Sequence, residues 1–283
     1  MILVTGATGT IGSEVVRLLA ARGEQVRALT RDPARAKLPA GVDVVRGDFD
    51  DPVSLERAAA GATALFLLSA PGPSVSLHDR AMLAPARAAG TRRVVKLSAI
   101  GTDEPGGARV GAWHAPGEAA VQGSGMAWTL LRPSSFASNA VTWAGALRAG
   151  APIPNLTGAG KQGVVDPRDV AAVAVEALTS AGHADRAYTL TGPELLSVPD
   201  QAVRLGDVLG RAVETVDVPL DVARQQLVDS GMDAAFADGV MDGSEFVRGG
   251  GGAVLTGEVE DVLGRPPGGF DAWVRDHRDV FGV

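Results

Sequence analysis

A glycine-rich turn between a short apolar run and a helical pattern constrains the fold of this chain more than any other feature. Residues 1–5 read MILVT, which is typical of a buried strand. Gly6, Gly9 and Gly12 follow at intervals of three residues, and apolar residues then recur at helical spacing over residues 11–21. Glycines at such places permit a tight turn, close approach of the backbone to a diphosphate, and close packing of the helix on the strand. The turn therefore predicts a nucleotide bound at the helix N-terminus, where the helix dipole is positive.

Short apolar runs alternate with helical patterns through the first half of the chain. Six strands are predicted, at residues 1–5, 25–29, 42–46, 64–68, 93–97 and 127–131. Helices are predicted at residues 11–21, 78–89 and 113–123, and after the Asp-Pro pairs at residues 32–33 and 51–52. Strands of nearly continuous apolar character indicate a parallel sheet covered by helices on both faces. The sequence therefore predicts an α/β fold of the Rossmann-like kind, with a doubly wound parallel sheet.

The regular alternation ends after the sixth strand. Further elements are predicted as a helix at residues 136–149, a Gly- and Pro-rich loop at 151–163, a helix from 167 to 178, a strand at 187–191, and amphipathic helices from 198 onward. We expect a nucleotide-binding domain over residues 1–150, which residues 165–193 rejoin. A smaller, mostly helical C-terminal lobe is expected over residues 194–283 with 151–164. Because ligands of doubly wound folds bind at the carboxyl ends of the strands, we expect this lobe to cover a substrate there.

The composition excludes several kinds of chemistry. The 283 residues include no cysteine, so disulfides, thiolate metal sites and a catalytic cysteine are excluded. His78, His183 and His277 are scattered and offer no metal-binding spacing, so no metal is expected. The net charge of −7 argues against a general nucleic-acid binder. The apolar start is too short for a signal peptide or a membrane span, so we expect a cytoplasmic protein whose partner is neither nucleic acid nor membrane. The oligomeric state stays open.

The residues about 20 positions beyond the turn bear on the choice of cofactor. Arg31 stands at the predicted end of the second strand, where a guanidinium can bind a 2′-phosphate and stack on adenine. The alternative is a solvated surface arginine. Asp32 could bind a ribose hydroxyl, but Pro33 after it favours a helix N-cap. The sequence thus favours NADP(H) over NAD(H).

Other candidate residues fall where predicted strands end. Asp48 could bind the adenine amine and Phe49 could flank the ring, the alternatives being a loop acid and a core aromatic residue. Ser69, Ala70 and Ser98 end the fourth and fifth strands, along which the ribose and nicotinamide should lie.

Several motifs can be compared with known families. They are TGATGTIG (residues 5–12), the strand-end Arg31, GDFDDP (47–52), SGMAWTLLRPSSFASN (124–139), DPRDVAAVAVEAL (166–178) and GHADRAYTLTGPE (182–194). These residues resemble the NmrA-like branch of the atypical short-chain dehydrogenases/reductases, from residue 1 to about residue 193. That branch includes NAD(P)H-dependent quinone and dye reductases, and also redox-sensing regulators that bind the dinucleotide without known turnover. The resemblance implies a Rossmann domain that binds NADP(H), with the substrate in a cleft under a small C-terminal lobe.

The resemblance also assigns site residues. It implies cofactor contacts from Gly6, Thr8, Gly9, Thr10, Ile11, Arg31, Asp48 and the segment at Ser69. It places Pro133, Ser135 and Phe136 near the nicotinamide. For the Leu-Arg-Pro sequence at residues 131–133 a structural interpretation stands beside this one, because it ends the sixth strand and turns the chain.

The chain lacks the tyrosine–lysine dyad that many short-chain dehydrogenases use. In that dyad, a lysine four residues after a tyrosine lowers the pKa of the phenol, which can then exchange a proton with an alcohol or carbonyl. Tyr188 is the one tyrosine in the chain, and Gly192 occupies the position of the lysine. Ketoreductase, epimerase or dehydratase chemistry by that dyad is therefore not expected.

The helix where the dyad would stand carries His114 and Glu118 instead. Their spacing puts them on one helical face, where His114 could donate a proton or orient a substrate oxygen and Glu118 could hold its tautomer. The dye and quinone reductases of the branch resemble this His-x-x-x-Glu arrangement. The alternative is a surface ion pair or a space-filling histidine. Trp113, Phe136 and Trp143 could line a flat aromatic substrate pocket with His114, or they could belong to the core.

These residues suit hydride transfer to an acceptor that needs little acid catalysis. Hydride added to a quinone or another conjugated acceptor makes a stabilised anion that water can protonate. The first hypothesis is therefore an NADPH-dependent oxidoreductase acting on a quinone-like, conjugated or aromatic small molecule. Two alternatives stay open: a non-catalytic NADP(H)-binding redox sensor, and a tailoring ketoreductase of secondary metabolism with His114 as its proton donor.

Overall fold

The computed structural model describes residues 1–103 and 109–282 of the chain. The chain forms two compact units, of which the first comprises Met1–Thr102, Gly111–Arg132 and Arg168–Tyr188, and the second Asp103–Val110, Pro133–Pro167 and Thr189–Val283. The main division lies at the end of a strand, between Arg132 and Pro133, whereas the expected domain boundary was residue 150. Apolar residues between Ala137 and Leu147 are buried together with C-terminal helices, which accounts for the earlier division.

A seven-stranded sheet in the order β3-β2-β1-β4-β5-β6-β9 forms the centre of the first unit. The strands are β1 (Ile2–Val4), β2 (Val26–Thr30), β3 (Asp43–Arg46), β4 (Ala64–Leu67), β5 (Arg93–Leu97), β6 (Ala127–Pro133) and β9 (Arg186–Leu190). Neighbouring strands from β3 to β6 pair in parallel. β9 runs the same way as β6, because the amide of Asp185 donates to the carbonyl of Trp128 and, further along both strands, Ser134 donates to Leu190. The predicted doubly wound parallel sheet is thus confirmed.

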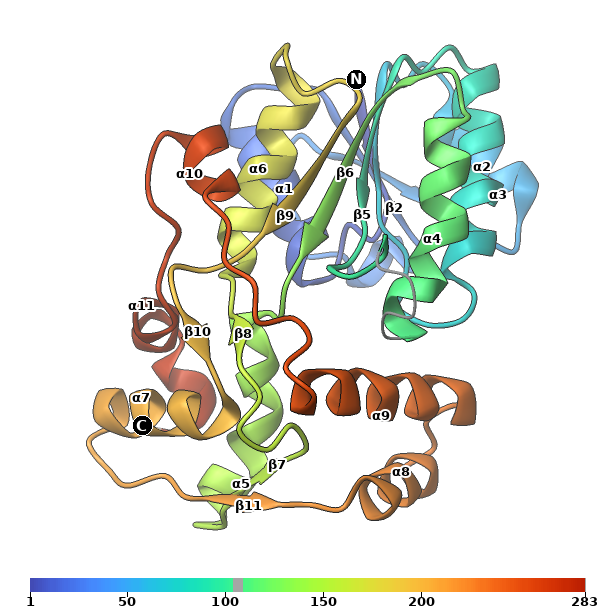
Figure 1. Ribbon diagram of the computed structural model, residues 1–283. Helices are drawn as coiled ribbons and strands as arrows, with labels where there is room; N and C mark the ends of the chain where they lie inside the picture. Colours follow the sequence, from blue (N-terminus) through green and yellow to red (C-terminus); the bar gives the residue numbers. More distant parts are fainter. Residues whose placement is uncertain (104–108, 283) are drawn as a thin grey trace. The chain divides into compact units, whose positions relative to one another are not determined.

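Helices cover both faces of this sheet. α1 (Thr10–Ala21) and α6 (Pro167–Thr179) lie on one face, and α2 (Pro52–Ala59), α3 (Val75–Ala88) and α4 (Arg109–Gln122) lie on the other (Figure 1). Asp51 accepts a hydrogen bond from the amide of Ser54 at the start of α2. Asp32 accepts one from Ala34 at the start of η1 (Pro33–Arg35), a 3-10 helix. Both Asp-Pro pairs therefore cap helices, as the sequence predicted.

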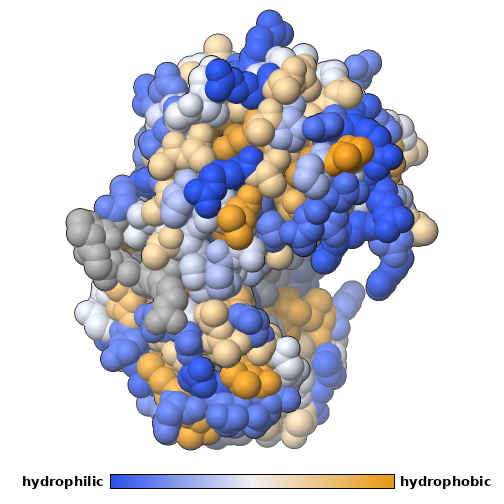
Figure 2. Space-filling view, turned by 90° about the vertical axis from the view of Figure 1, so that its right-hand side faces the viewer, coloured by the Kyte–Doolittle hydropathy of each residue, from blue (hydrophilic) through white to orange (hydrophobic). Residues whose placement is uncertain are grey.

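The main apolar cluster of the first unit joins the sheet to α2, α3 and α4. Leu3, Leu65 and Val94 of the strands are fully buried with Leu55 of α2 and Met82 of α3. Burial of each such side chain contributes roughly 1.5–3 kcal/mol. The outer side of these helices mixes hydrophilic residues with separate hydrophobic ones (Figure 2). This packing fixes the carboxyl ends of the strands, where the candidate site lies.

The second unit is mostly helical and has a core of its own. Its elements are η2 (Ala137–Trp143), α5 (Ala144–Arg148), β7 (Ile153–Asn155), β8 (Gln162–Gly163), β10 (Leu195–Leu196), α7 (Val198–Leu209), β11 (Thr215–Asp217), α8 (Leu220–Asp229), α9 (Ala234–Arg248), α10 (Glu258–Leu263), α11 (Phe270–Asp276) and η3 (Arg278–Phe281). Its buried cluster includes Trp143, Leu205, Phe270, Trp273 and Phe281. The predicted helical C-terminal region is therefore confirmed.

The segment at residues 151–163, predicted as a loop, contains two short strands. β7 pairs with β11 in parallel, and β8 pairs with β10 antiparallel. Ile153 of β7 is fully buried. The Gly- and Pro-rich composition gave no sign of these strands, because their partners lie far along the chain. Residues 136–149 were predicted as one helix, but they form the 3-10 helix η2 followed by the short α-helix α5.

In the described part of the chain, no helix combines the length and the apolar character that crossing a membrane requires. The same residues contain no cluster of three His, Asp or Glu side chains that could hold a metal ion.

Candidate functional site

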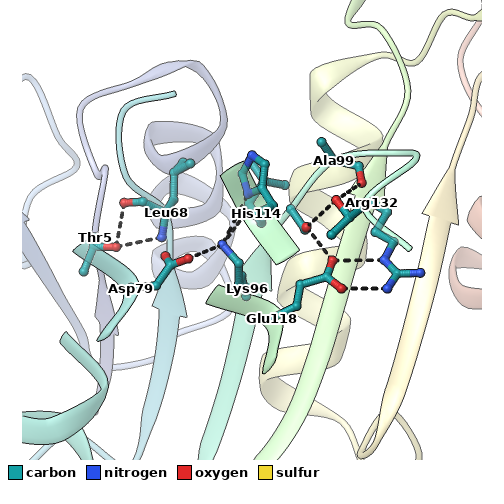
Figure 3. A network of polar contacts seen from close by, with 11 residues as sticks. Thr5, Leu68, Asp79, Lys96, Ala99, His114, Glu118 and Arg132 are labelled. Atoms are coloured by element: carbon teal, nitrogen blue, oxygen red, sulfur yellow. Dashed lines mark hydrogen bonds and ion pairs between the residues drawn. The ribbon is translucent and has the colours of Figure 1, made fainter. Parts of the chain in front are cut away.

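The glycine turn follows β1, in the middle of the sheet. The Oγ1 of Thr5 donates to the carbonyl oxygen of Leu68 and accepts from its amide, both at 2.8 Å, which joins the ends of β1 and β4 (Figure 3). Gly6 has a φ of +61°, a left-handed conformation that glycine adopts without strain. A Cβ on Gly12 would lie 2.1 Å from the carbonyl oxygen of Gly6. The turn itself therefore requires glycine at both positions.

The start of α1 fits a bound diphosphate. Gly9 is the N-cap and supplies no capping side chain, so amides of the first turn are left to other partners. Thr8, Gly9 and Thr10 are exposed, whereas Ile11 and Gly12 are buried. An open helix start behind a turn too tight for side chains is the arrangement that a dinucleotide requires.

A second observation at the neighbouring strand points the same way. Ser69 follows β4, and its Oγ is buried without a hydrogen-bond partner among the described residues. A buried hydroxyl normally has a partner, so this oxygen is well suited to bind a ligand. Together with the turn, it shows that the residues present fit a dinucleotide cofactor.

The residues predicted for the adenosine half of the cofactor follow β2 and β3. Arg31 is exposed, whereas Asp32 uses its carboxylate as the N-cap of η1. The Oδ1 of Asp48 accepts from the amide of Asp50 at 3.2 Å. Phe49 stacks on the ring of His78, with ring centroids 4.8 Å apart, and packs against the core. Phe49 is therefore half-buried at the edge of the core, and its expected place beside the adenine stays a prediction.

The other predicted residues are divided between the two units. The first unit holds Ala70, which is exposed, and Trp113, which is half-buried on α4. The second unit holds the remaining four, Pro133, Ser135, Phe136 and Trp143. Trp143 is a buried residue of the second core, and the half-buried Phe136 forms an isolated bridge with Val165.

Glu118 of α4 binds two side chains from the sheet. Its Oε1 accepts from the Nε of Arg132 at 3.0 Å and from the Oγ of Ser98 at 2.5 Å, and its Oε2 accepts from the Nη2 of Arg132 at 2.6 Å. Ser98 follows β5 and Arg132 belongs to β6, so one carboxylate joins α4 to two strands (Figure 3). Both oxygens of Glu118 are engaged in this way, and the structure places a different side chain beside His114.

That side chain is Lys96 of β5. Its Nζ lies 3.4 Å from the Nδ1 of His114 and 2.6 Å from the Oδ2 of Asp79 on α3 (Figure 3). Lys96 and Asp79 are 1% and 0% exposed. Burial raises the pKa of Asp79, and the charge of Lys96 opposes that rise. Sequence reasoning missed this pair, although a lysine between the apolar residues of a predicted buried strand is a signal that could have found it.

The imidazole of His114 is neutral at ordinary pH. Burial lowers its pKa to about 3, and the charge of Lys96 acts in the same direction. Because an ammonium group can only donate, the Nδ1 of His114 accepts from Lys96 and the Nε2 carries the ring proton. His114 is therefore a neutral hydrogen-bond donor on α4, the helix on which the sequence analysis expected the phenol of a dyad. Tyr188 belongs to β9, with its hydroxyl 2.9 Å from the Nδ1 of His183.

The match to a known family covers most of this arrangement. A model of the NAD(P)H-binding family matches residues 6–181. The chain belongs to the NAD(P)H-binding family. Its match begins at Gly6 of the turn and includes Lys96, His114 and Glu118. The predicted resemblance to the atypical short-chain dehydrogenases/reductases is thus confirmed.

Several proteins that are similar to this chain are reductases by name. The chain is 38% identical over 283 residues to the (4-alkanoyl-5-oxo-2,5-dihydrofuran-3-yl)methyl phosphate reductase of Streptomyces griseus, with 99% of each chain covered. It is 37% identical over 285 residues to the NAD(P)H azoreductase of Xenophilus azovorans, with 100% of each covered. The structure of an NADPH-dependent quinone oxidoreductase of Escherichia coli in complex with NADPH shares 26% identity with a TM-score of 0.86, covering 99% of this chain and 100% of that one. The likeness therefore extends over both units.

Proposed function

We propose that this protein is an NADPH-dependent reductase whose acceptor is a quinone-like or otherwise conjugated small molecule. The matched family and the similar reductases make the protein an NAD(P)H-dependent oxidoreductase. The proposal adds two points to this: the preferred cofactor is NADPH, and the acceptor is a conjugated molecule. It depends above all on one observation, the neutral His114 that offers an Nε2–H donor where a catalytic phenol is absent.

The residues that would hold the cofactor lie at consecutive strand ends. They are Gly6, Thr8, Gly9, Thr10, Ile11 and Gly12 after β1, Arg31 after β2, Asp48 after β3, Ser69 and Ala70 after β4, and Ser98 after β5. When bound, the nicotinamide supplies the hydride. The exposed guanidinium of Arg31 supports the preference for NADPH, because it can bind a 2′-phosphate that NADH lacks.

The similar proteins support a conjugated acceptor. Their names describe reduction of an unsaturated lactone, of azo compounds and of quinones. Hydride transfer to a conjugated system spreads the resulting charge, so the reaction needs mainly proximity and orientation. A neutral imidazole suits that task, because its N–H can bind the atom on which negative charge develops.

Further expectations from the sequence remain part of this proposal. Residues 194–283 with 151–164 would cover the acceptor, and Pro133, Ser135 and Phe136 would lie near the nicotinamide. The enzyme would work in the cytoplasm on a small-molecule substrate.

Oxidation of NADPH and NADH, followed by absorbance with a panel of quinones, azo dyes and simple ketones, tests the proposal. We expect turnover of quinones and a preference for NADPH of at least about tenfold, the size of one charged hydrogen bond. Tight binding of NADPH in a calorimeter without turnover of any acceptor would instead favour a redox sensor. Turnover of simple ketones alone would favour a ketoreductase.

A further inference from the structure

The first unit contains a buried ion pair that hydride transfer alone does not require. The Nζ of Lys96 is 2.6 Å from the Oδ2 of Asp79, and the Oδ1 of Asp79 has no hydrogen-bond partner in the described structure. A Cβ on Gly117 of α4 would lie 2.0 Å from that Oδ2, so the helix has a glycine where the pair needs room. Burying two charges costs several kcal/mol per ion before their attraction compensates. A pair at this place therefore suggests a role other than stability.

Lys96 links the ion pair to His114 by a hydrogen bond in which Lys96 is the donor and His114 the acceptor. Lys96 has three N–H bonds, which face the Oδ2 of Asp79, the Nδ1 of His114 at 3.4 Å and its neighbour's carbonyl, Leu97 O, at 3.3 Å. The ring proton of His114 is therefore on Nε2, on the far side of the ring from Lys96. Asp79, Lys96 and His114 form a line from the protein interior to a half-buried donor (Figure 3).

We propose that Lys96 and Asp79 form a proton relay that recharges His114 when the acceptor gains a proton on oxygen. This inference rests on the proposed function. As hydride adds to a carbonyl of a quinone-like acceptor, negative charge collects on its oxygen. The Nε2–H bond of His114 breaks as the new O–H bond forms, and one N–H bond of Lys96 breaks as a proton binds Nδ1.

The charges balance in this step. The acceptor anion becomes neutral, His114 stays neutral with its proton moved to Nδ1, and the ammonium of Lys96 becomes an amine. The negative charge of Asp79 is then uncompensated in the interior, which favours return of the proton from Nδ1 to Lys96 and uptake of a proton from water at Nε2. The raised pKa of Asp79 is consistent with this, because burial already disfavours its charge.

Other charged groups around the relay have partners or lie at its edge. Glu118 of α4 and Arg132 of β6 bind each other, and His78 and Arg80 flank Asp79 on α3. Among the described residues, the titratable groups that approach the Nζ of Lys96 itself are Asp79 and His114.

The relay predicts that loss of Lys96 slows the reduction of acceptors that need a proton and not the reduction of acceptors that need none. A quinone becomes an anion when hydride adds, so it requires a proton. A cationic triphenylmethane dye becomes a neutral molecule when hydride adds to its central carbon, so it requires none. Both reactions need bound NADPH and a correctly folded site, and the dye therefore serves as an internal control for the quinone.

Lys96→Met and the paired variant Lys96→Met/Asp79→Leu test the relay, with the exposed Lys161→Met as the matched control. The paired variant leaves no unpaired carboxylate if the single variant fails to fold. We expect kcat for the quinone to fall at least about tenfold, within the range of general acid catalysis, while kcat for the dye changes less than about threefold. Equal losses on both acceptors, or no loss on either, would overturn the relay.

A measurement that does not depend on turnover separates the relay from the proposed function. In protein with ¹⁵N-labelled histidine, we expect one of the four imidazoles to be protonated on Nε2 alone over the neutral pH range, and this signal to change in Lys96→Met. An Nδ1-protonated or charged His114 would overturn the relay even if the enzyme reduces quinones. A wild type that reduces neither acceptor would overturn the proposed function, and the relay with it.

Discussion

Glu118 and Arg132 form a bidentate ion pair inside the first unit, with contacts of 2.6 Å and 3.0 Å. Their side chains are 6% and 12% exposed, so water screens the pair little. Removing one partner of such a pair leaves the other charge buried without that partner, which typically costs about 3–5 kcal/mol. The pair joins β6 to α4, the helix that carries His114, so losing either partner should disturb the packing of that helix.

We expect Glu118→Gln to lower the free energy of unfolding by about 3 kcal/mol, because the charge of Arg132 stays buried. Urea denaturation of the two proteins measures the difference. Glu14→Gln is the matched control, since Glu14 pairs with Arg17 at the surface, where a pair contributes less than about 1 kcal/mol. Equally small effects of both substitutions would contradict a stabilising role for the buried pair.

Gly12→Ala should weaken NADPH binding. The new Cβ would lie 2.1 Å from the carbonyl oxygen of Gly6, so the turn has to open and the amides of α1 lose their positions. We expect the Kd for NADPH, measured by calorimetry, to rise at least about tenfold, which corresponds to about 1.4 kcal/mol. Gly145→Ala in α5 has open space around the added carbon and should leave the Kd unchanged. Unaltered binding by Gly12→Ala would argue against a cofactor at this turn.

Arg31→Ala should change the choice between the two cofactors. Its guanidinium is expected to bind the 2′-phosphate, so its loss should raise the Kd for NADPH at least about tenfold and leave the Kd for NADH nearly unchanged. Arg35→Ala is the control, because Arg35 is also exposed and lies in the adjacent η1. An equal rise in the Kd for both cofactors would show that Arg31 does not bind the 2′-phosphate.

The lowered pKa of His114 should make stability depend on pH. The unfolded chain binds a proton on this ring below about pH 6.5, but the folded protein does so only near pH 3. Between these values the unfolded state holds more protons, so stability falls as the pH falls, by up to about 1.4 kcal/mol per pH unit. Urea denaturation between about pH 6.5 and about pH 4 should therefore show a smaller loss for His114→Gln than for the wild type. Identical slopes for the two proteins would disprove the neutral ring of His114.

Much of the first unit follows from local signals in the sequence. The run at residues 1–5, the three glycines and the apolar pattern of α1 act within a few residues of one another, so a single stretch of chain determines strand, turn and helix. Asp51 and Asp32 cap helices through amides only two or three residues away. Such contacts form in almost any fold that contains the segment, which is why the sequence predicts them.

The pair of Lys96 and Asp79 is a different case. A strand and a helix bring these residues together, and neither the alternation of apolar runs nor the spacing of motifs reveals which helix covers which strand. The same reason applies to β7 and β11, whose pairing depends on how the second unit folds. The role expected of Glu118 depended on helical spacing alone, whereas its partners Ser98 and Arg132 come from the sheet.

The chain has three lysines, and the buried one is Lys96, while Lys37 and Lys161 have exposed side chains. Amine-reactive coupling to a solid carrier would therefore proceed at those two surface positions and at the terminal amine. Immobilised preparations should keep their quinone turnover, because the reagent does not reach the amine beside His114.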